Sequence, residues 1–225
     1  MGRKDEDIAS TFWQFINEHR DSQSLTFWLD NSACQNKNWT LFTVLLTAVN
    51  VNNFEVQKIT LKFFESGHTF MSADSAHAEI EEAMKVKKQV FDFRDFVECV
   101  DTTLCKAFVT KTVNFRQWVS GTSQYKLRQS EDRPMLANIS VAEFRRGSSE
   151  FFYKNSHQSN EFASFNFLKK DFVMSEKPSQ TQPRGIPKEK KDAILKKLVH
   201  LMPENRREFW RELEVSEVVD LIDNV

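Results

Sequence analysis

The first residues able to do chemistry stand directly behind a short apolar stretch. Residues 25–29 are aromatic and β-branched, which predicts a buried strand, and Asp30 and Asn31 follow it at once. Ligands of α/β proteins collect at the carboxyl ends of strands, and Mg²⁺ is held by one or two carboxylates and several waters. Asp30 is therefore a candidate metal ligand. The alternative, which spacing alone favours, is an Asx turn between strand and loop.

A second group of polar side chains follows the next predicted strand, residues 58–64. Asp74, His77, Glu79 and Glu81 fall at its exit and on the helix expected behind it, residues 72–88. His77 lies three residues from Asp74 and four from Glu81, so each pair shares a helix face. A strand-end aspartate with a helix-borne carboxylate suits two-metal phosphoryl transfer. A helix N-cap for Asp74 and a surface position for His77 are the alternatives, each favoured when taken alone.

A third chemistry is that of a cysteine hydrolase built on Cys34 with His68 or His77. Nothing in the sequence positions an orienting third residue, so this class ranks last. Cys34, Cys99 and Cys105 contain no CxxC pair, which argues against zinc and against a disulfide scaffold and favours a reducing compartment.

The composition excludes several other classes. The 225 residues carry a formal charge of −1, so any grip on nucleic acid must be local. With five glycines and no GxGxxG or GxxxxGK[ST] string, a nucleotide-cofactor site is excluded. No apolar run reaches the roughly 20 residues needed to span a bilayer, and the charged start is not a signal peptide. We expect an intracellular protein without membrane partners.

The elements that must position these residues alternate between helix and strand in the first half of the chain. Helices are expected at residues 7–20, 38–49, 72–88 and 96–107, and strands at 25–29, 58–64 and 90–93. Alternation at these lengths is typical of βαβ units. The fold class is therefore α/β over residues 1–107.

The second half of the chain has a different character. Short β segments are expected at residues 109–113, 139–144, 150–153 and 162–168, which make residues 108–174 a β-rich extension. Residues 175–186 have the composition of a linker, and residues 187–225 form a helical tail with apolar stripes of its own.

Basic side chains offer local candidates for contact with nucleic acid. Arg145 and Arg146 lie in the hairpin turn predicted at residues 145–149, and exposed loops commonly carry binding residues. The lysines at residues 85–88 and 188–197 are interleaved with acids, which favours solvated helix faces over phosphate contacts.

Two central motifs resemble a family of invertebrate transposon-derived proteins. Its pattern is roughly DNCxxQNKN followed by GHTxMxxDxxHxxIE, matched here by residues 28–39 and 60–77. Residues 90–98, 186–195 and 202–210 are also similar to segments of that family. The resemblance covers most of the chain and its two central motifs are fairly specific.

The resemblance implies a DDE-type, RNase H-like domain that acts on DNA with Mg²⁺ or Mn²⁺. On this basis Asp30 is the second acid of the site, and Asp74 with His77 or Glu81 supplies the later ligands. Gln35, Asn36 and Lys37 line the loop. The residues expected to contact DNA are Gln35 and Lys37 in this loop, together with Arg145 and Arg146 in the predicted turn. A DNA-acting protein is expected in the nucleus.

The chain departs from that family at its start. The first strand, its hairpin partners and the first acid are not found before Leu25. We therefore expect an incomplete core, an inactive site and an unpaired strand edge at residues 25–29 that invites a protein partner or a second copy. A non-enzymatic interaction module that kept the scaffold is the alternative function.

Overall fold

A computed structural model describes residues 5–32, 36–64, 72–118, 133–170, 172–183 and 185–216. The chain folds into two compact units, and each is built from stretches that are separate in sequence. Unit 1 comprises Met1–Thr69 and Thr110–Gln180, and unit 2 comprises Phe70–Val109 and Thr181–Val225. The fold class is α/β, as the sequence predicts. No described helix is long and apolar enough to cross a membrane.

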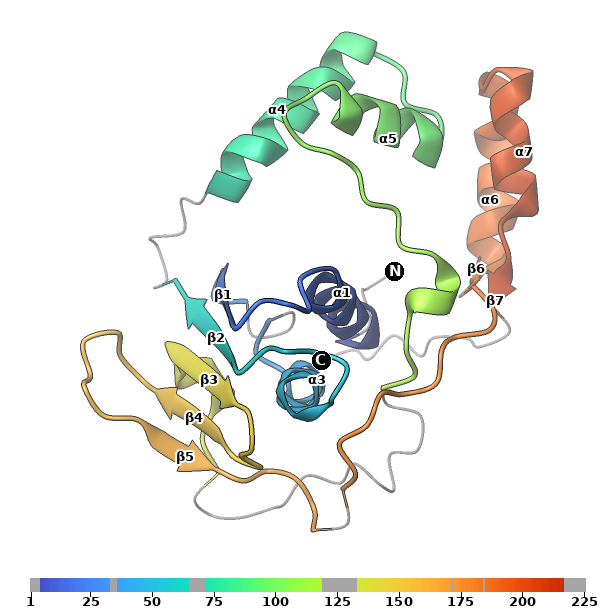
Figure 1. Cartoon of the computed structure of the whole chain (residues 1–225). Helices are drawn as coiled ribbons and strands as arrows, with labels where there is room; N and C mark the ends of the chain where they lie inside the picture. Colours follow the sequence, from blue (N-terminus) through green and yellow to red (C-terminus); the bar gives the residue numbers. More distant parts are fainter. Residues whose placement is uncertain are drawn as a thin grey trace. The chain divides into compact units, whose positions relative to one another are not determined.

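Unit 1 is organised around a five-stranded sheet whose strands follow the order β1-β2-β3-β4-β5 (Figure 1). β1 and β2 are parallel, whereas β3, β4 and β5 each run antiparallel to the preceding strand. β1 lies at the edge of the sheet with β2 as its one neighbour among the described strands. The bounds are β1 Ser24–Leu29, β2 Lys58–Phe63, β3 Val141–Arg145, β4 Phe151–Lys154 and β5 Ala163–Phe165.

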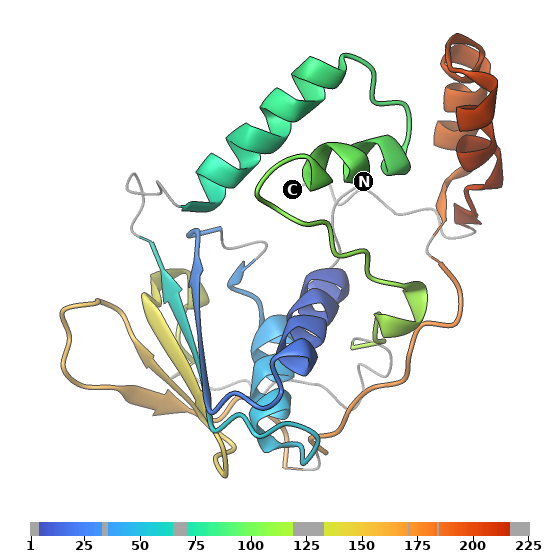
Figure 2. The same ribbon diagram turned by 45° about the horizontal axis from the view of Figure 1, so that its top comes forward.

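Two helices, α1 (Asp5–Glu18) and α3 (Trp39–Asn50), lie on the same face of this sheet (Figures 1 and 2). Residues 41–49 of α3 are all buried, because the helix is apolar on nearly every side and packs between α1 and the sheet. The inward side chains of the strands complete the core, whose largest fully buried members include Phe42, Phe63, Phe144 and Phe151. The opposite face of the sheet carries neither α1 nor α3.

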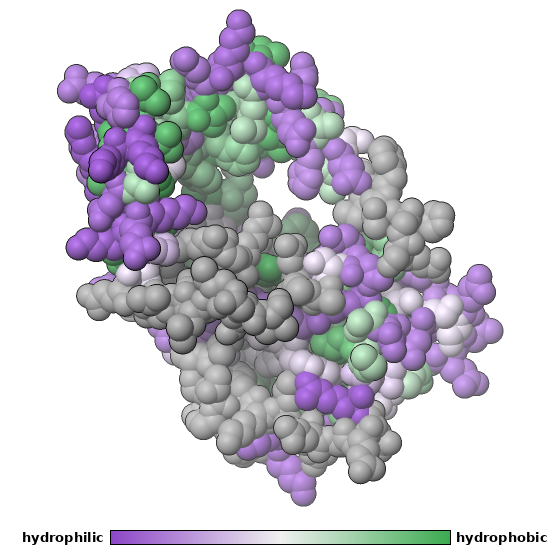
Figure 3. All heavy atoms as spheres, turned by 180° about the vertical axis from the view of Figure 1, so that it is seen from behind, coloured by the Kyte–Doolittle hydropathy of each residue, from purple (hydrophilic) through white to green (hydrophobic). Residues whose placement is uncertain are grey.

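Unit 2 contains a helical hairpin and a second helical segment. The hairpin is α4 (Ser72–Lys87) with α5 (Phe93–Asp101). In the second segment α6 (Lys188–Lys197) and α7 (Glu204–Glu212) stand above a small parallel pair, β6 (Ile186–Pro187) with β7 (Val215–Ser216). Seen from behind, the surface of α6 and α7 at the upper left of Figure 3 is mainly hydrophilic. Neither helix has a fully buried residue, so both rest on partial burial and polar contacts.

Gly185 allows β6 and β7 to approach each other. A Cβ atom placed on it would lie 2.3 Å from the backbone nitrogen of Ser216. Because that neighbour is backbone and cannot rotate away, a larger residue at this position would separate the two strands.

Two of the predicted strands, residues 90–93 and 109–113, are absent from the described structure. Residues 90–93 form no strand, because the Asp92 side chain accepts a hydrogen bond from the backbone of Asp95 at 2.8 Å and caps α5, which begins at Phe93. α5 ends at Asp101 rather than at residue 107. In place of the strand expected at residues 109–113 the chain makes a 3-10 turn, Thr112–Asn114.

The expected β-rich extension belongs to the main sheet. β3 pairs with β2 so that Lys62 lies opposite Val141 and Lys58 lies opposite Arg145. Part of the expected linker is also fixed on unit 1, because Gln180 donates its backbone N–H to Phe115 at 2.7 Å and Ser179 bridges to Arg116. The two units therefore divide the chain differently from the segments expected from the sequence.

Candidate functional site

The loop after β1 sits at the carboxyl end of the parallel pair β1–β2. Asp30 is the first residue beyond the strand and is half-buried. Its carboxylate accepts a hydrogen bond from the side-chain amide of Asn36, and the backbone of Asn36 bonds to Ser32 at 3.0 Å. Asn36 thus connects back to Asp30 and Ser32 on the other side of the loop. Gln35, which the resemblance assigns to the same loop, lies outside the described residues.

Lys37 turns toward the protein interior. Only 6% of it is exposed; its Nζ donates to the carbonyl of Ala137 at 2.9 Å and lies 4.6 Å from the ring centre of Phe63. Burial lowers the pKa of this ammonium, because charge is less well solvated there than in water. Lys37 therefore ties the loop to the residues before β3, a contact that holds its ammonium away from open solvent.

An open groove of about 680 Å³ adjoins this loop at the start of α3. Asn38 caps the helix by accepting from the backbone of Leu41 at 2.8 Å. Arg133 lies across the groove with its guanidinium 4.3 Å from the ring centre of Trp39, and burial lowers its pKa. Burial, with a smaller effect of Glu6, raises the pKa of Asp5, which also lines the groove. The groove therefore brings two cations and one carboxylate together.

The other expected metal ligands lie on α4 in unit 2. Asp74, His77 and Glu81 are all exposed on that helix. A hollow of about 800 Å³ between α4 and α5 is lined by Glu79 but by none of these three. Asp30 belongs to unit 1, so neither unit by itself contains the expected set.

A site for two Mg²⁺ or Mn²⁺ ions needs several carboxylate or imidazole side chains close together. Among the described residues no group of three or more His, Cys, Asp or Glu side chains could hold a metal ion. The carboxylate of Asp30 is engaged by Asn36 rather than aimed at a second acid. The described donor set does not fit a two-metal centre.

Arg145 and Arg146 are adjacent in sequence, but Arg146 binds backbone carbonyls whereas Arg145 stays partly exposed. The guanidinium of Arg146 donates to three backbone carbonyls, those of Phe54, Val56 and Val51, at 2.7, 3.3 and 2.9 Å. It therefore holds the turn after α3 and has few donors left for a ligand. Arg145 lies on the outer face of the sheet, where it pairs with Glu143 at 2.8 Å and keeps 41% of its side chain exposed.

His157, a residue that the sequence patterns do not single out, contacts both β1 and the end of β2. Its Nε2 lies 2.8 Å from the carbonyl oxygen of Phe63, and its ring stacks on Trp28 with 6.1 Å between ring centres. Trp28 is on β1, 129 positions earlier in the sequence. The spacing of apolar residues along the sequence does not predict such a long-range contact.

The family comparison adds one finding. A family model described as "Domain of unknown function (DUF7869)" matches residues 7–158. The chain belongs to the DUF7869 family. A search of curated proteins and a search of solved structures each found no match.

The DUF7869 match covers every described residue of the expected site. It runs from within α1 to just beyond β4 and includes Asp30, Lys37, Asp74, Arg145 and His157. α6 and α7 lie beyond it. The family description names no activity, so a function has to be inferred from the geometry of the site.

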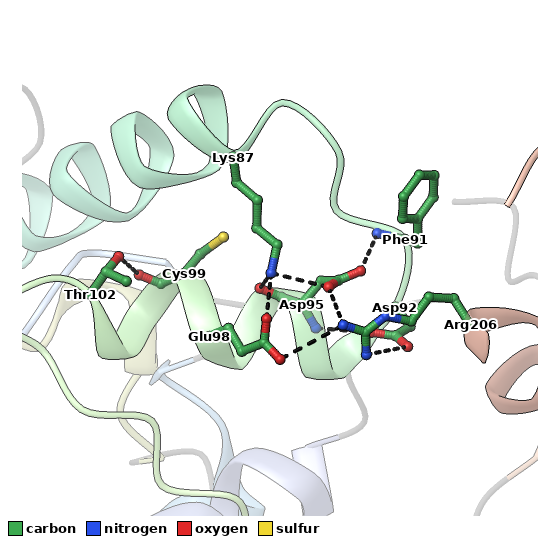
Figure 4. Close-up of polar contacts among 8 residues, drawn as sticks. All are labelled: Lys87, Phe91, Asp92, Asp95, Glu98, Cys99, Thr102 and Arg206. Atoms are coloured by element: carbon green, nitrogen blue, oxygen red, sulfur yellow. Dashed lines mark hydrogen bonds and ion pairs between the residues drawn. The ribbon is translucent and has the colours of Figure 1, made fainter. Parts of the chain in front are cut away.

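A polar network in unit 2 connects α5 with α4 and α7 (Figure 4). The Asp95 carboxylate, 3% exposed, lies 3.0 Å from Lys87 Nζ and 2.9 Å from the Arg206 guanidinium, and it accepts the Phe91 N–H at 2.9 Å. Burial would raise the pKa of Asp95, but the Phe91 hydrogen bond and the two cations outweigh it and lower that pKa. Each buried acid of the network, Asp92 and Asp95, has a cation beside it, so the network connects the helices structurally.

Proposed function

We propose that this chain is a transposase-derived, RNase H-like protein that binds DNA and does not by itself carry out metal-dependent phosphoryl transfer. The observation that carries the proposal is the position of Asp30. It stands at the carboxyl end of β1, in a parallel β1–α3–β2 arrangement, where α/β proteins bind their ligands. A protein with this role would work in the nucleus.

Two further features support binding without cleavage. The groove beside the loop contains Arg133, a cation that an anionic ligand would stabilise. The Asp30 carboxylate is hydrogen-bonded to Asn36, which suits a residue that shapes a loop. According to the resemblance, Mg²⁺ or Mn²⁺ would be held by Asp30 and Asp74 with His77 or Glu81. Because these residues are divided between the two units, neither unit alone contains enough ligands for metal-dependent cleavage.

A plasmid-nicking assay tests the absence of cleavage. Supercoiled DNA is incubated with the protein and Mg²⁺ or Mn²⁺, beside Asp30→Asn and the control Asp21→Asn, whose side chain is exposed. We expect all three to show the same background. Nicking that is lost in Asp30→Asn and kept in Asp21→Asn would show that the chain is an active nuclease and contradict the proposal. Nicking that survives both Asp30→Ala and Asp74→Ala would remove these residues from the site.

A second candidate function is a protein-interaction module that uses the edge of β1. The strand Ser24–Leu29 contains no charged residue and no proline, the devices that usually protect a sheet edge. A second copy or another chain could add a strand there through backbone hydrogen bonds.

Sizing chromatography separates this candidate from the first. Thr26 is exposed at the middle of β1, and a lysine there would block edge pairing. If the edge joins two copies, Thr26→Lys will convert an oligomer to a monomer whereas Ser75→Lys on α4 will not. A wild-type chain that elutes as a monomer at all concentrations would rule out self-pairing.

A further inference from the structure

The outer face of the unit 1 sheet, the one opposite α1 and α3, carries an ordered set of cations and aromatic rings. Side chains alternate along strands, and cross-strand partners share a face, so the registers define this face completely. It consists of three rows: Trp28, Lys62, Val141 and Lys154; then Thr26, Thr60, Glu143, Phe152 and Ser164; then Ser24, Lys58 and Arg145. We call these three rows, with Phe162 just before β5, the outer face.

The charge of the outer face differs from that of the whole chain. Four cations, Lys58, Lys62, Arg145 and Lys154, face one carboxylate, Glu143, which gives a local net charge of +3 where the chain as a whole has −1. Glu143 is 14% exposed and already paired with Arg145. An anionic ligand would therefore meet a positive surface.

The cations and rings alternate in space. Lys62 Nζ lies 4.8 Å from the ring centre of Trp28, and Arg145 Cζ lies 3.9 Å from that of Phe152. Lys154 Nζ lies 4.3 Å from the ring centre of Phe162, which Arg145 also approaches at 5.3 Å. Half of Trp28 is exposed although it is a large apolar side chain on a regular strand. Each ring thus has a cation beside it, although Arg145 also pairs with Glu143 at 2.8 Å and Lys154 Nζ also donates to the Ser159 carbonyl at 2.7 Å. The Trp28 ring also stacks on His157.

We propose that the outer face binds a segment of single-stranded DNA, with Lys62, Arg145 and Lys154 on phosphates and Trp28, Phe152 and Phe162 against bases. Open sheet faces with exposed rings are used in this way because every base has a stacking face and unpaired bases can reach it. The rings extend from β1 to β4, three strand spacings or about 14 Å, which is room for more than one base. The inference rests on the proposed DNA-binding function and names its surface.

An unpaired nucleic-acid strand fits this face better than a duplex or an acidic peptide, and the choice of DNA over RNA follows from the proposed function. A duplex hides the faces of its bases, so it would use the cations and leave the rings without a partner. An acidic peptide would likewise use only the charges. Rings lie in the first two rows and at Phe162, and cations lie in the first and third rows. This combination of rings and cations is what favours an unpaired strand.

Fluorescence anisotropy with matched charge variants tests the proposal. The probe is a labelled oligo-dT of about 12 nucleotides, within the roughly 4–16 that single-strand sites cover. Lys62→Gln/Arg145→Gln/Lys154→Gln removes three charges from the outer face, and Lys190→Gln/Lys196→Gln/Lys197→Gln removes three from exposed positions of α6. We expect the first triple to weaken binding roughly tenfold or more and to reduce the slope of log K against log[salt] by about 2, at about 0.7 for each phosphate contact. The control triple should change neither.

A ring variant provides an independent measurement. Trp28→Ala should weaken binding roughly tenfold, whereas Trp28→Phe, which keeps a stacking face, should restore most of the affinity. A matched duplex, an oligo-U RNA and poly-glutamate are run beside the DNA.

The outcomes separate this inference from the proposed function. If the wild type does not bind oligo-dT or the duplex at about 50 mM salt, the proposed DNA-binding function is wrong and the inference fails with it. If the wild type binds but both triples lose affinity equally, DNA binding stands and the outer face is not the site. Tighter binding of the duplex or RNA, or displacement by poly-glutamate at equal charge, would overturn the assignment to single-stranded DNA.

Discussion

The two units of this protein are stabilised in different ways. The main apolar cluster lies entirely in unit 1, where α1, α3 and the inner face of the sheet enclose side chains such as Phe42 and Phe144. In the described part of unit 2 the buried apolar side chains are Cys99, Val100 and Val199, and Asp92 and Asp95 are buried as well. Unit 1 therefore depends mainly on apolar burial and unit 2 on a charged network, so mutation, salt and pH should affect them unequally.

The largest effect should come from emptying the core of unit 1. Phe42 is fully buried and packs edge-to-face against Phe144 and Phe151, at 5.3 and 5.2 Å between ring centres. Phe42→Ala should lower the free energy of unfolding of unit 1 by about 3–5 kcal/mol, measured by urea denaturation. Met135→Ala, at a position of unit 1 that is 70% exposed, should change it by less than about 0.5 kcal/mol. Equal effects of the two would show that the cluster is not the core.

A smaller effect is expected from breaking the network in unit 2. Asp95→Ala removes the carboxylate shared by Lys87 and Arg206 and should cost about 2–3 kcal/mol. Hydrogen exchange should speed up in α5 and α7 and stay unchanged in β2 and β3. The control is Glu79→Ala on the exposed face of α4, where we expect no change. Faster exchange in the sheet would mean that the two units do not unfold separately.

Acid should affect unit 2 through the same residue. The folded-state pKa of Asp95 is lower than its ordinary value of 3.8, so the unfolded chain takes up the proton first as the pH falls. Stability from this carboxylate is present above about pH 4 and is lost as the pH drops through the lowered pKa. Trp210, whose indole donates to Phe91 at 2.9 Å, reports on unit 2, and Trp13 and Trp118 report on unit 1. Their indole NMR signals, followed down to about pH 3, should show Trp210 changing first.

The smallest of these effects should come from a helix cap in unit 1. Asn38→Ala removes the acceptor for the Leu41 N–H and should cost about 1 kcal/mol in urea denaturation. Asn38→Asp keeps an acceptor and should retain most of the stability. A loss in Asn38→Asp as large as in Asn38→Ala would show that the side chain does something other than cap α3.

Local patterns could predict the first half of unit 1. The apolar runs that became β1, α3 and β2 have the periods of their elements, and the position of Asp30 beyond β1 follows directly from them. The strands β3 to β5 were also expected, but their place beside β2 was not, because pairs such as Lys62 with Val141 lie 79 positions apart. Pairing of distant strands depends on packing, which no local period encodes.

The site shows the same division. The hydrogen bond from Asn36 to Asp30 is local, whereas the hydrogen bond from Lys37 to Ala137 spans 100 positions and buries a side chain that the sequence leads us to expect at DNA. Arg146 likewise bonds to carbonyls more than 90 positions away. The strand predicted at residues 90–93 could have been recognised as a helix start, because Asp92 and Asp95 have the spacing of a capping box. The short apolar run at these residues favoured a strand instead.

A titration followed at the tryptophan indoles tests the central claim most directly. Oligo-dT is added to the ¹⁵N-labelled protein at low salt, and the signals of Trp28 and Trp210 are compared. If the outer face of unit 1 binds single-stranded DNA, the Trp28 signal will shift or broaden with the added DNA while that of Trp210 in unit 2 stays in place. A shift at Trp210 with Trp28 unmoved would contradict the account.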